Sequence, residues 1–447
     1  MSRKDNVNEW DDEAESNVWS YYMTEAYVNR KPPPLTTFAL SRFRPVHCAP
    51  VNIYGLDAFL YVFGSAGTNS GCAGNLEELA KWKIIPRMLR DATVRNLNTT
   101  LFGVKYKSPL IVGPVGVQGI MHKDAECATS AAAAQVGVPF VMSTASTRSI
   151  EDVAASSGSG TRWYQIYWPV DDDISLSLLR RAKASGYTNL VVTLDTMLLG
   201  WRTHDLDRPY LPFLHGVGSQ VGLSDPVFMK KHGLEPILEP PEFPYDPDEV
   251  ERRCKAGDEK MIVRARMAVE WLKQTNSGKF RSWNDLKLLR DNWEGPLILK
   301  GILSVQDAEM AMEHGVDGII VSNHGGRQVD SVIPAIWALD KICASPKIKA
   351  AQQSGKLTVM FDSGIRTGSD IIKAIALGAQ GVLIARPFMY GLAVGGQTGV
   401  EQVLRQTLAD LEITLGLAGF TNLQDLWGKR EEVVDAVHFC IPPLYLL

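Results

Sequence analysis

The stretch Gly318–Gln328, GIIVSNHGGRQ, joins an apolar run directly to a cluster of polar residues and glycines. The run Gly318–Val321 shows no polar alternation, as expected for a parallel strand that is covered on both faces. Behind it come His324 and Arg327, separated by two glycines. We therefore interpret this stretch as a buried strand that ends at a functional site.

Similar apolar runs recur along the chain, each followed by polar or glycine-containing residues and then by a helical pattern. Alternating strands and helices favour a (β/α)8 barrel, with an open doubly wound sheet as the competitor. The competitor is disfavoured because no GxGxxG turn follows the first run. The eight runs are Leu110–Pro114, Phe140–Thr144, Trp163–Tyr167, Leu190–Asp195, Leu297–Gly301, Gly318–Asn323, Thr358–Ser363 and Gly381–Arg386. The expected helices include Lys123–Gln135, Ile174–Ser185, Ser304–His314, Gly368–Leu377 and Gly399–Leu415.

These spacings predict a barrel domain over residues 106–420. Residues 1–105 are expected to form a helical cap and an extension, with the stretch GSAGTNSG at 64–71 as a loop. The gap between the fourth and fifth runs predicts an insertion at about 203–290, because a connection this long is typical of a lid or an insertion. Residues 421–447 are interpreted as a C-terminal tail.

The composition limits the classes of partner. The chain has 447 residues, of which 46 are basic and 50 acidic, and no basic block could follow a nucleic-acid backbone. The polar start is unlike a signal peptide, and no apolar run reaches the roughly 18 residues that span a bilayer. The six scattered cysteines have no metal-ligand spacing and suit a reducing compartment. We expect a cytoplasmic protein without nucleic-acid, membrane or metal partners.

Two arginine-containing stretches follow the last two runs. Asp362–Arg366 reads DSGIR and Ala385–Pro387 reads ARP. Barrels often bind phosphate behind their seventh and eighth strands, where backbone N–H groups and a helix start meet. An arginine there adds a bidentate phosphate contact. We therefore predict a phosphate site.

A second group of polar residues follows the fourth and sixth runs. His324 is a potential base, and Asp195 is a carboxylate that could orient it. The guanidinium groups of Arg202 and Arg327 could clamp an anionic substrate. Together the two groups predict a phosphate-bearing cofactor beside a carboxylate-bearing substrate.

Several motifs also carry a family resemblance. They are similar, in the same order, to signatures of the FMN-dependent α-hydroxy-acid oxidases and dehydrogenases, the group of glycolate oxidase and cytochrome lactate dehydrogenase. The resemblance runs from about Tyr61 to Gly419, and it looks closest to the lactate 2-monooxygenase branch. The motifs are YQIYWP (164–169), TLDTMLLGWR (193–202), LKG (299–301), SNHGGRQ (322–328), FDSGIRTG (361–368) and LIARP (383–387). YWP, Gly200–Arg202 and SDPVF (224–228) carry the likeness to that branch.

The resemblance implies a role for each site residue. His324 would remove a proton from a 2-hydroxy acid, with Asp195 supporting the imidazolium. The residues expected to bind the substrate are Tyr61, Tyr167, Arg202 and Arg327. Those expected at the flavin ring of FMN are Pro114, Val115, Gly116, Ser143, Gln165, Thr193 and Lys300. Those expected at its ribityl chain and phosphate are Ser322, Asp362, Ser363, Gly364, Arg366, Ala385 and Arg386.

The implied activity is the oxidation of a small, lactate-like 2-hydroxy acid to the 2-keto acid, with molecular oxygen as acceptor. Gly116, which is alanine in many oxidases, favours the monooxygenase branch, in which the keto acid is oxidatively decarboxylated. Ala145 stands where glycolate oxidase-like members carry tryptophan, which is expected to enlarge the pocket. A dehydrogenase with a quinone or carrier-protein acceptor stays open, as does a flavin-binding protein without turnover. The resemblance also implies a homo-oligomer, either a tetramer or an octamer.

Overall fold

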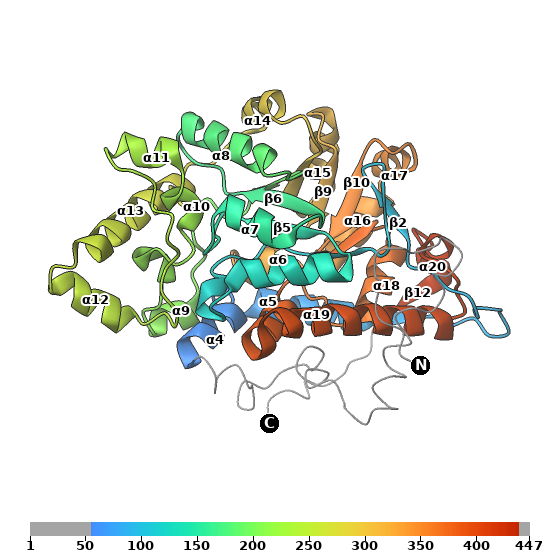
Figure 1. Ribbon diagram of the computed structural model, residues 1–447. Helices are drawn as coiled ribbons and strands as arrows, with labels where there is room; N and C mark the ends of the chain where they lie inside the picture. Colours follow the sequence, from blue (N-terminus) through green and yellow to red (C-terminus); the bar gives the residue numbers. More distant parts are fainter. Residues whose placement is uncertain (1–54, 438–447) are drawn as a thin grey trace.

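The computed structural model describes residues 55–437, and within them the expected runs form one closed parallel barrel (Figure 1). Each strand pairs with its neighbour in sequence, and the last strand pairs with the first. The (β/α)8 prediction is confirmed, because an open doubly wound sheet would leave two free edges. The strands are β4 (Leu110–Val112), β5 (Phe140–Ser143), β6 (Arg162–Ile166), β7 (Leu190–Thr193), β8 (Leu297–Ile302), β9 (Gly318–Val321), β10 (Thr358–Phe361) and β11 (Gly381–Ile384).

Two layers of side chains fill the inside of the barrel. Successive side chains of a strand point to opposite faces, so positions two residues apart share the interior. The first layer is a buried apolar cluster that includes Ile111, Val141, Trp163, Val191, Ile298, Ile320, Met360 and Leu383. The second layer is formed by the residues two positions later in each chain segment, toward the carboxyl end of the strand. They are Gly113, Ser143, Gln165, Thr193, Lys300, Ser322, Asp362 and Ala385. This second, mostly polar layer faces the mouth at the carboxyl ends of the strands.

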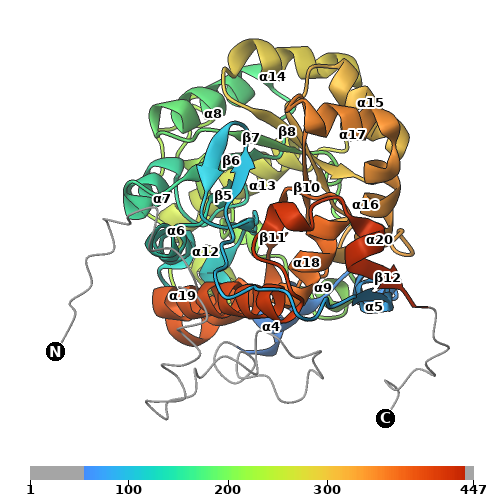
Figure 2. The same cartoon turned by 90° about the vertical axis from the view of Figure 1, so that its right-hand side faces the viewer.

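A short hairpin covers the opposite end of the barrel (Figure 2). It consists of β2 (Thr99–Leu101) and β3 (Val104–Tyr106), which pair antiparallel. Leu101 belongs to the first apolar layer, and the Phe102 ring meets the Trp163 ring edge-on at 5.8 Å. The barrel is therefore sealed by apolar side chains at this end, and the polar mouth is the end available to ligands.

Helices surround the barrel on its outer side (Figure 1). The expected helix 399–415 is the second part of a longer one, α19 (Arg386–Leu417), whose helical geometry breaks at Gly395 and Gly396. The first part of α19 begins directly behind β11. None of the helices within residues 55–437 is long and apolar enough to cross a membrane. The other helices are α6 (Ala125–Val136), α7 (Ile150–Ser157), α8 (Asp172–Ala184), α14 (Leu286–Asn292), α15 (Val305–Glu313), α16 (Ala335–Ala344), α17 (Pro346–Gln353) and α18 (Gly368–Ala376).

Besides the hairpin of β2 and β3, the described segment before the barrel forms two helices and one strand. They are α4 (Leu56–Phe63), α5 (Ser70–Lys81) and β1 (Trp82–Ile84), and β1 pairs with β12 (Val434–Ala436) near the chain end. The glycine-rich stretch at 64–71 is a loop as far as Asn69, and its last two residues already belong to α5. The predicted boundaries of the cap and the tail stay predictions, since residues 1–54 and 438–447 lie outside the described part.

The long connection between β7 and β8 folds into a helical subregion at one side of the barrel (Figure 1). Its α13 (Glu259–Thr275) and the short helix η3 (Pro212–His215) send aromatic residues, Trp271 and Phe213, toward the mouth. The insertion is therefore part of the cavity wall. The same connection also contains α9 (Thr203–Asp207), α10 (Gln220–Leu223), α11 (Pro226–Lys231), α12 (Pro247–Lys255), the short helix η4 (Trp283–Asp285) and α14.

Candidate active site

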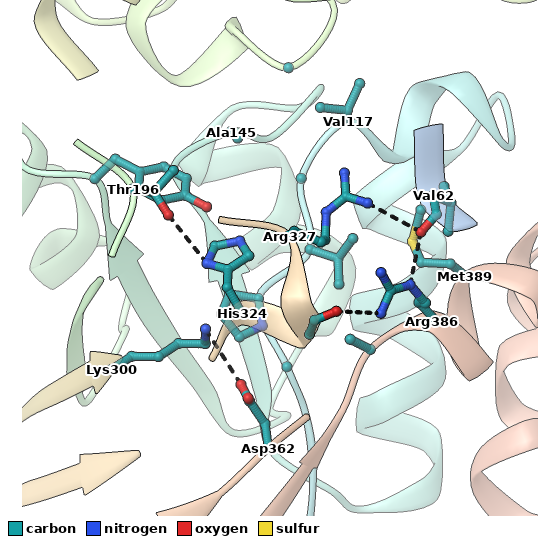
Figure 3. A pocket seen from close by; sticks show the side chains of 18 of the residues that line it. Val62, Val117, Ala145, Thr196, Lys300, His324, Arg327, Asp362, Arg386 and Met389 are labelled. Carbon is teal, nitrogen blue, oxygen red and sulfur yellow. Dashed lines mark hydrogen bonds and ion pairs between the residues drawn. The ribbon is translucent and has the colours of Figure 1, made fainter. Parts of the chain in front are cut away.

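A single cavity at the barrel mouth collects most of the predicted site residues (Figure 3). Those that line it are Tyr61, Pro114, Val115, Gly116, Tyr167, Arg202, Lys300, His324, Arg327, Asp362, Ser363, Gly364, Arg366, Ala385 and Arg386. The remaining ones do not line it: Ser143, Gln165, Thr193, Asp195 and Ser322. These five residues lie just beneath the cavity lining. Ser143 donates a hydrogen bond to Gln165, and Thr193 pairs in register with Lys300. Ser322 accepts a hydrogen bond from Lys300, and Asp195 pairs with His324.

His324 is held by a carboxylate on the far side of its ring. Its Nδ1 lies 2.8 Å from Oδ1 of Asp195, and the hydroxyl of Thr196 donates to the same oxygen at 2.8 Å. An ionised carboxylate only accepts hydrogen bonds, so we assign the ring proton to Nδ1. This tautomer leaves Nε2 as the nitrogen with a free lone pair.

His324 and Asp195 each shift the pKa of the other. Burial lowers the pKa of His324, and the nearby carboxylate of Asp195 only partly opposes this. Burial alone would raise the pKa of Asp195, but the charges of His324 and Lys300 hold it well below its usual range. At a pH above the lowered pKa of His324, a neutral imidazole therefore lies beside the ionised carboxylate of Asp195. Such a pair can take up a proton and stabilise the imidazolium that forms.

The backbone around His324 explains the two glycines behind it. His324, Gly325 and Gly326 all have left-handed backbone angles, with φ of 58°, 65° and 77°. A side chain on Gly326 would also collide with the backbone of Cys72 in α5, and one on Gly325 would meet the guanidinium of Arg386 at 2.8 Å. The glycines let the chain turn sharply here while α5 packs directly on it.

Two arginines that line the same cavity come from the segments behind two different strands, Arg202 behind β7 and Arg327 behind β9. Arg202 donates from Nη2 to Oε1 of Gln328 at 2.9 Å and from Nε to the carbonyl of Arg327 at 3.1 Å. Arg327 donates to the carbonyl of Gly64 at 2.6 Å, and its guanidinium lies over the Tyr61 ring, 5.5 Å from the centroid. The loop after α4 thus orients Arg327 at the mouth.

Two more arginines stand where the phosphate site was predicted. Arg386 begins α19, and Arg366 lies just before α18, so both side chains sit beside helix N-termini. Burial and the charges of Arg202 and Arg386 lower the pKa of Arg327. Burial and Arg386 do the same to Arg366. Guanidinium groups gathered in this way repel one another, and an anion between them relieves the repulsion.

A family assignment follows from comparison with known proteins. The sequence profile of a family described as FMN-dependent dehydrogenase matches residues 54–434. The chain belongs to this family. An FMN-dependent alpha-hydroxy acid dehydrogenase of Penicillium citrinum, qulF, is 45% identical over 369 residues, 82% of this chain and 84% of the relative. An L-lactate oxidase of Lysinibacillus sphaericus is 36% identical, covering 82% and 86% of the two chains.

A solved structure agrees with the sequence relatives. The crystal structure of mandelate oxidase matches with a TM-score of 0.69 at 30% identity, covering 87% of this chain and 97% of that one. These matches make the chain an FMN-dependent α-hydroxy-acid oxidoreductase. The resemblance in its motifs is therefore confirmed at the level of the family, the enzyme class and the cofactor.

The polar layer of the barrel fits the ring of an FMN cofactor. The side chain of Ser143 donates to Oε1 of Gln165 at 3.0 Å, while Nε2 of Gln165 is buried without a partner within residues 55–437. A buried amide donor without an acceptor costs free energy, and an acceptor atom of a flavin ring would satisfy it. Thr193 pairs in register with Lys300 in the same layer.

Lys300 supplies a buried positive charge to this layer. Its Nζ donates to Oγ of Ser322 at 3.0 Å and lies 3.4 Å from Oδ2 of Asp362, and the residue is only 4% exposed. Burial would lower its pKa, but the carboxylates of Asp362 and Asp195 outweigh burial and raise it. The ammonium therefore stays charged, beside the place where an electron-rich ring would lie.

Two tyrosines, Tyr61 and Tyr167, line the same cavity. Burial raises the pKa of Tyr61, although Arg202 and Arg327 act in the opposite direction. Burial also raises the pKa of Tyr167 to about 12, with Lys300 opposing. Both hydroxyls are therefore protonated at neutral pH and can donate hydrogen bonds to an anionic ligand.

Some supporting residues were absent from the predicted site. Gln328 donates from Nε2 to the carbonyl of Asp195 at 2.7 Å, so it joins the loop of Asp195 to Arg202. Gln328 and Thr196 lie inside the quoted motifs, which could have marked them. Asn75 forms a reciprocal side-chain pair with Asn323, at 2.8 and 2.7 Å. No local signal in α5 could have found Asn75.

The loops behind β4 and β5 approach each other closely. A methyl group on Gly116 would lie 2.5 Å from both Cβ and the carbonyl oxygen of Ala145. The backbone N–H of Val117 donates to that same carbonyl at 2.8 Å. The room that a methyl group on Gly116 would need is thus taken by the backbone of the neighbouring loop.

Proposed function

We propose that this FMN-dependent enzyme oxidises a lactate-like 2-hydroxy acid to the 2-keto acid and uses molecular oxygen as the electron acceptor. The observation that carries the proposal is the paired His324 and Asp195 at a cavity that also holds Arg202 and Arg327. A base and an anion clamp in one cavity suit a substrate with a carboxylate next to the carbon that is oxidised.

In this proposal, Arg202 and Arg327 bind the substrate carboxylate, and Tyr61 and Tyr167 donate hydrogen bonds to its carboxylate and hydroxyl. The free lone pair on Nε2 of His324 accepts the proton that the substrate loses. The carboxylate of Asp195 then stabilises the positive charge on the ring. These roles agree with the neutral imidazole and the protonated tyrosines described above.

FMN supplies the acceptor for the two electrons that leave the C2 carbon. Its ring would lie against Pro114–Gly116 and the polar layer formed by Ser143, Gln165, Thr193 and Lys300. Its ribityl chain and phosphate would be held by Ser322, Asp362, Ser363, Gly364, Arg366, Ala385 and Arg386. The cavity-lining arginines and the starts of α18 and α19 support this placement of the phosphate.

The direct test is a visible spectrum of the purified holoenzyme followed by anaerobic titration with lactate. The proposal expects loss of the flavin absorbance as two electrons enter from each substrate molecule. Binding of FMN without any bleaching by 2-hydroxy acids would instead support a flavin-binding protein without turnover.

The acceptor is tested by mixing the reduced enzyme with oxygen in a stopped-flow instrument. A rival acceptor, a quinone or a carrier protein, is favoured by the name of the qulF relative, a dehydrogenase. Rapid reoxidation by oxygen supports the proposed oxidase, and slow reoxidation supports the rival. We further propose oxidative decarboxylation, as in the monooxygenase branch, and stoichiometric peroxide with intact keto acid would reject it.

The assembly and location of the protein belong to the same proposal. Family resemblance supports a homo-oligomer, a tetramer or an octamer, which light scattering of the holoenzyme would test. The free thiols of Cys72, Cys127, Cys254 and Cys343 suit a reducing cytoplasm. Localisation of the tagged protein in its own cells would test that assignment.

A further inference from the structure

The cavity extends past its charged groups into an apolar part, which we call the side-chain lobe. Its walls are Val117, Ala145, Leu199, Phe213 and Trp271, and all five line the same cavity as His324. None of these side chains carries a charge or can accept a proton. The lobe therefore cannot serve the carboxylate or the proton transfer, which the arginines and His324 already serve.

The lobe is built from loops of the barrel and from the long insertion. Val117 and Ala145 follow β4 and β5, and Leu199 follows β7. Phe213 and Trp271 come from η3 and α13 of the insertion, where they are only 8% and 2% exposed. Sequence patterns alone left the substrate side chain undefined, because nothing in them placed the insertion against the mouth.

Close packing behind the walls fixes the shape of the lobe. A side chain on Gly218 would lie 2.7 Å from Phe213 and 2.9 Å from Val117, so these two walls touch the backbone between them. The Trp271 ring meets the Phe228 ring edge-on at 5.2 Å. The aromatic walls are thus held from behind and do not collapse into the lobe.

The direction of the lobe follows from the charged groups. Figure 3 shows Val117 and Ala145 across the cavity from His324 and Lys300. A substrate whose carboxylate binds Arg202 and Arg327, with C2 at His324, has its side chain as the remaining apolar part. On the basis of the proposed function, we infer that this side chain occupies the lobe and is larger than the methyl group of lactate.

The preferred substrates are then 2-hydroxy acids with a branched aliphatic or aromatic side chain. Removing apolar groups from water is favourable roughly in proportion to the area buried, and a methyl group covers little of these walls. Relative to lactate, 3-phenyllactate or 2-hydroxy-4-methylpentanoate should raise the second-order rate constant of flavin reduction about tenfold or more. Lactate stays a substrate, because its carboxylate and hydroxyl meet the same polar groups.

The first experiment measures anaerobic flavin reduction in the FMN-loaded enzyme with lactate, 2-hydroxy-4-methylpentanoate and 3-phenyllactate, each as separate enantiomers. A larger rate constant for the bulky acids supports the lobe. Bleaching by all three acids with lactate equal or fastest overturns the lobe and leaves the proposed function standing. Bleaching by none of them overturns the proposed function itself.

The second experiment uses two neighbouring leucines as a matched pair. Leu199 lines the cavity, whereas Leu198 is 52% exposed and does not line it. Leu199→Trp should fill the lobe and lower the ratio of the 3-phenyllactate to the lactate rate constant about tenfold. Leu198→Trp should leave this ratio as in the parent enzyme. An equal change of the ratio in both variants, or no change in either, would overturn the inference.

Discussion

His324 is constrained by its backbone, by its ring and by the charges around it. Its φ of 58° is a left-handed conformation that non-glycine residues seldom adopt, so the surrounding structure must hold it. On one side of the ring, Asp195 and Thr196 both lie within hydrogen-bond distance of Nδ1. The pairing of Nδ1 leaves Nε2 as the nitrogen that would accept the proton in the proposed function, so the loss of His324 should matter most.

We therefore expect His324→Gln to slow flavin reduction by about 10²- to 10⁴-fold, the usual range for loss of a general base. The glutamine keeps a hydrogen-bonding side chain of similar reach, so FMN should stay bound and the visible spectrum of the oxidised enzyme should change little. Anaerobic stopped-flow reduction with a 2-hydroxy acid measures the effect. A variant that reduces its flavin at the parent rate would remove His324 from the reaction.

The pH dependence of the reaction should report the same residue. The base must be neutral, and burial lowers the pKa of His324 below its ordinary value of 6.5. The acidic limb of the kcat/KM profile should therefore fall below pH 6.5, with activity rising as pH rises through it. The negative charge of Asp195 raises the pKa of His324, so Asp195→Asn should move the limb to still lower pH.

The same Asp195→Asn variant should also lose about 100-fold in kcat, because the imidazolium is no longer stabilised. A shift of the limb to higher pH would contradict the assigned pairing. A suitable control is Asp330→Asn, which changes a carboxylate that holds Thr68 and Ser70 without contacting His324. Its acidic limb should stay at the parent position.

At the scale of elements, α5 acts as a support for the loop behind β9. Asn75 pairs with Asn323 and also accepts from the backbone N–H of Ala335 at 3.0 Å. Asn75→Ala leaves these buried groups unpaired, so it should lower the free energy of unfolding by about 1–3 kcal/mol. It should also lower kcat/KM, because Gly326 packs on the same helix.

Unfolding of the holoenzyme in urea, followed by steady-state kinetics, measures both effects of Asn75→Ala. Asn292→Ala is the matched control, since Asn292 is exposed and its side chain donates locally to the carbonyl of Leu288 at 2.8 Å. Its unfolding free energy should change little. Equal stability of the two variants would mean that the asparagine pair does not hold the loop.

Substitutions in the loops behind β4 and β5 should have coupled effects on the free energy of unfolding. Gly116→Ala forces a methyl group against Ala145, and overpacking of this kind costs about 1–3 kcal/mol. Ala145→Gly in the same chain should restore only part of that loss, since the carbonyl oxygen of residue 145 stays in place. Thermal unfolding of the single and double variants measures the coupling free energy between positions 116 and 145. Gly74→Ala, whose methyl would meet only Pro334 at an ordinary 3.7 Å, should not destabilise.

The sequence predicted elements better than the contacts between distant ones. The continuous apolar runs located every barrel strand, because burial on both faces leaves a run without polar alternation in the sequence. The docking of α5 on Gly326 left no such pattern, because the contact joins residues about 250 positions apart and depends on the absence of a side chain. The sequence also did not indicate that Trp271 lines the cavity. An aromatic residue in a helix is expected to be buried, but the sequence does not show which surface it packs against.

On the scale of the whole molecule, the barrel places its apolar packing and its polar site residues at opposite ends. The hairpin β2–β3 and the apolar layer close one end, so the polar layer and every charged site residue gather at the other. The partly buried guanidinium groups of Arg366 and Arg386 lie close together at that end, and their mutual repulsion is costly unless an anion binds between them. The bound cofactor should therefore be a structural part of the fold as well as a reagent.

Cofactor binding should raise the thermal stability of the protein, and the phosphate should carry a large part of the effect. A ligand present at about a hundredfold excess over its Kd stabilises the native state by roughly 2.7 kcal/mol. FMN should raise the Tm of the cofactor-depleted protein more than an equal concentration of riboflavin, which lacks the phosphate that Arg366 and Arg386 would bind. Arg386→Ala should narrow the difference between the two flavins. Equal shifts of Tm by FMN and riboflavin in the parent protein would contradict a phosphate site at the starts of α18 and α19, because the ring and ribityl chain alone would then account for binding.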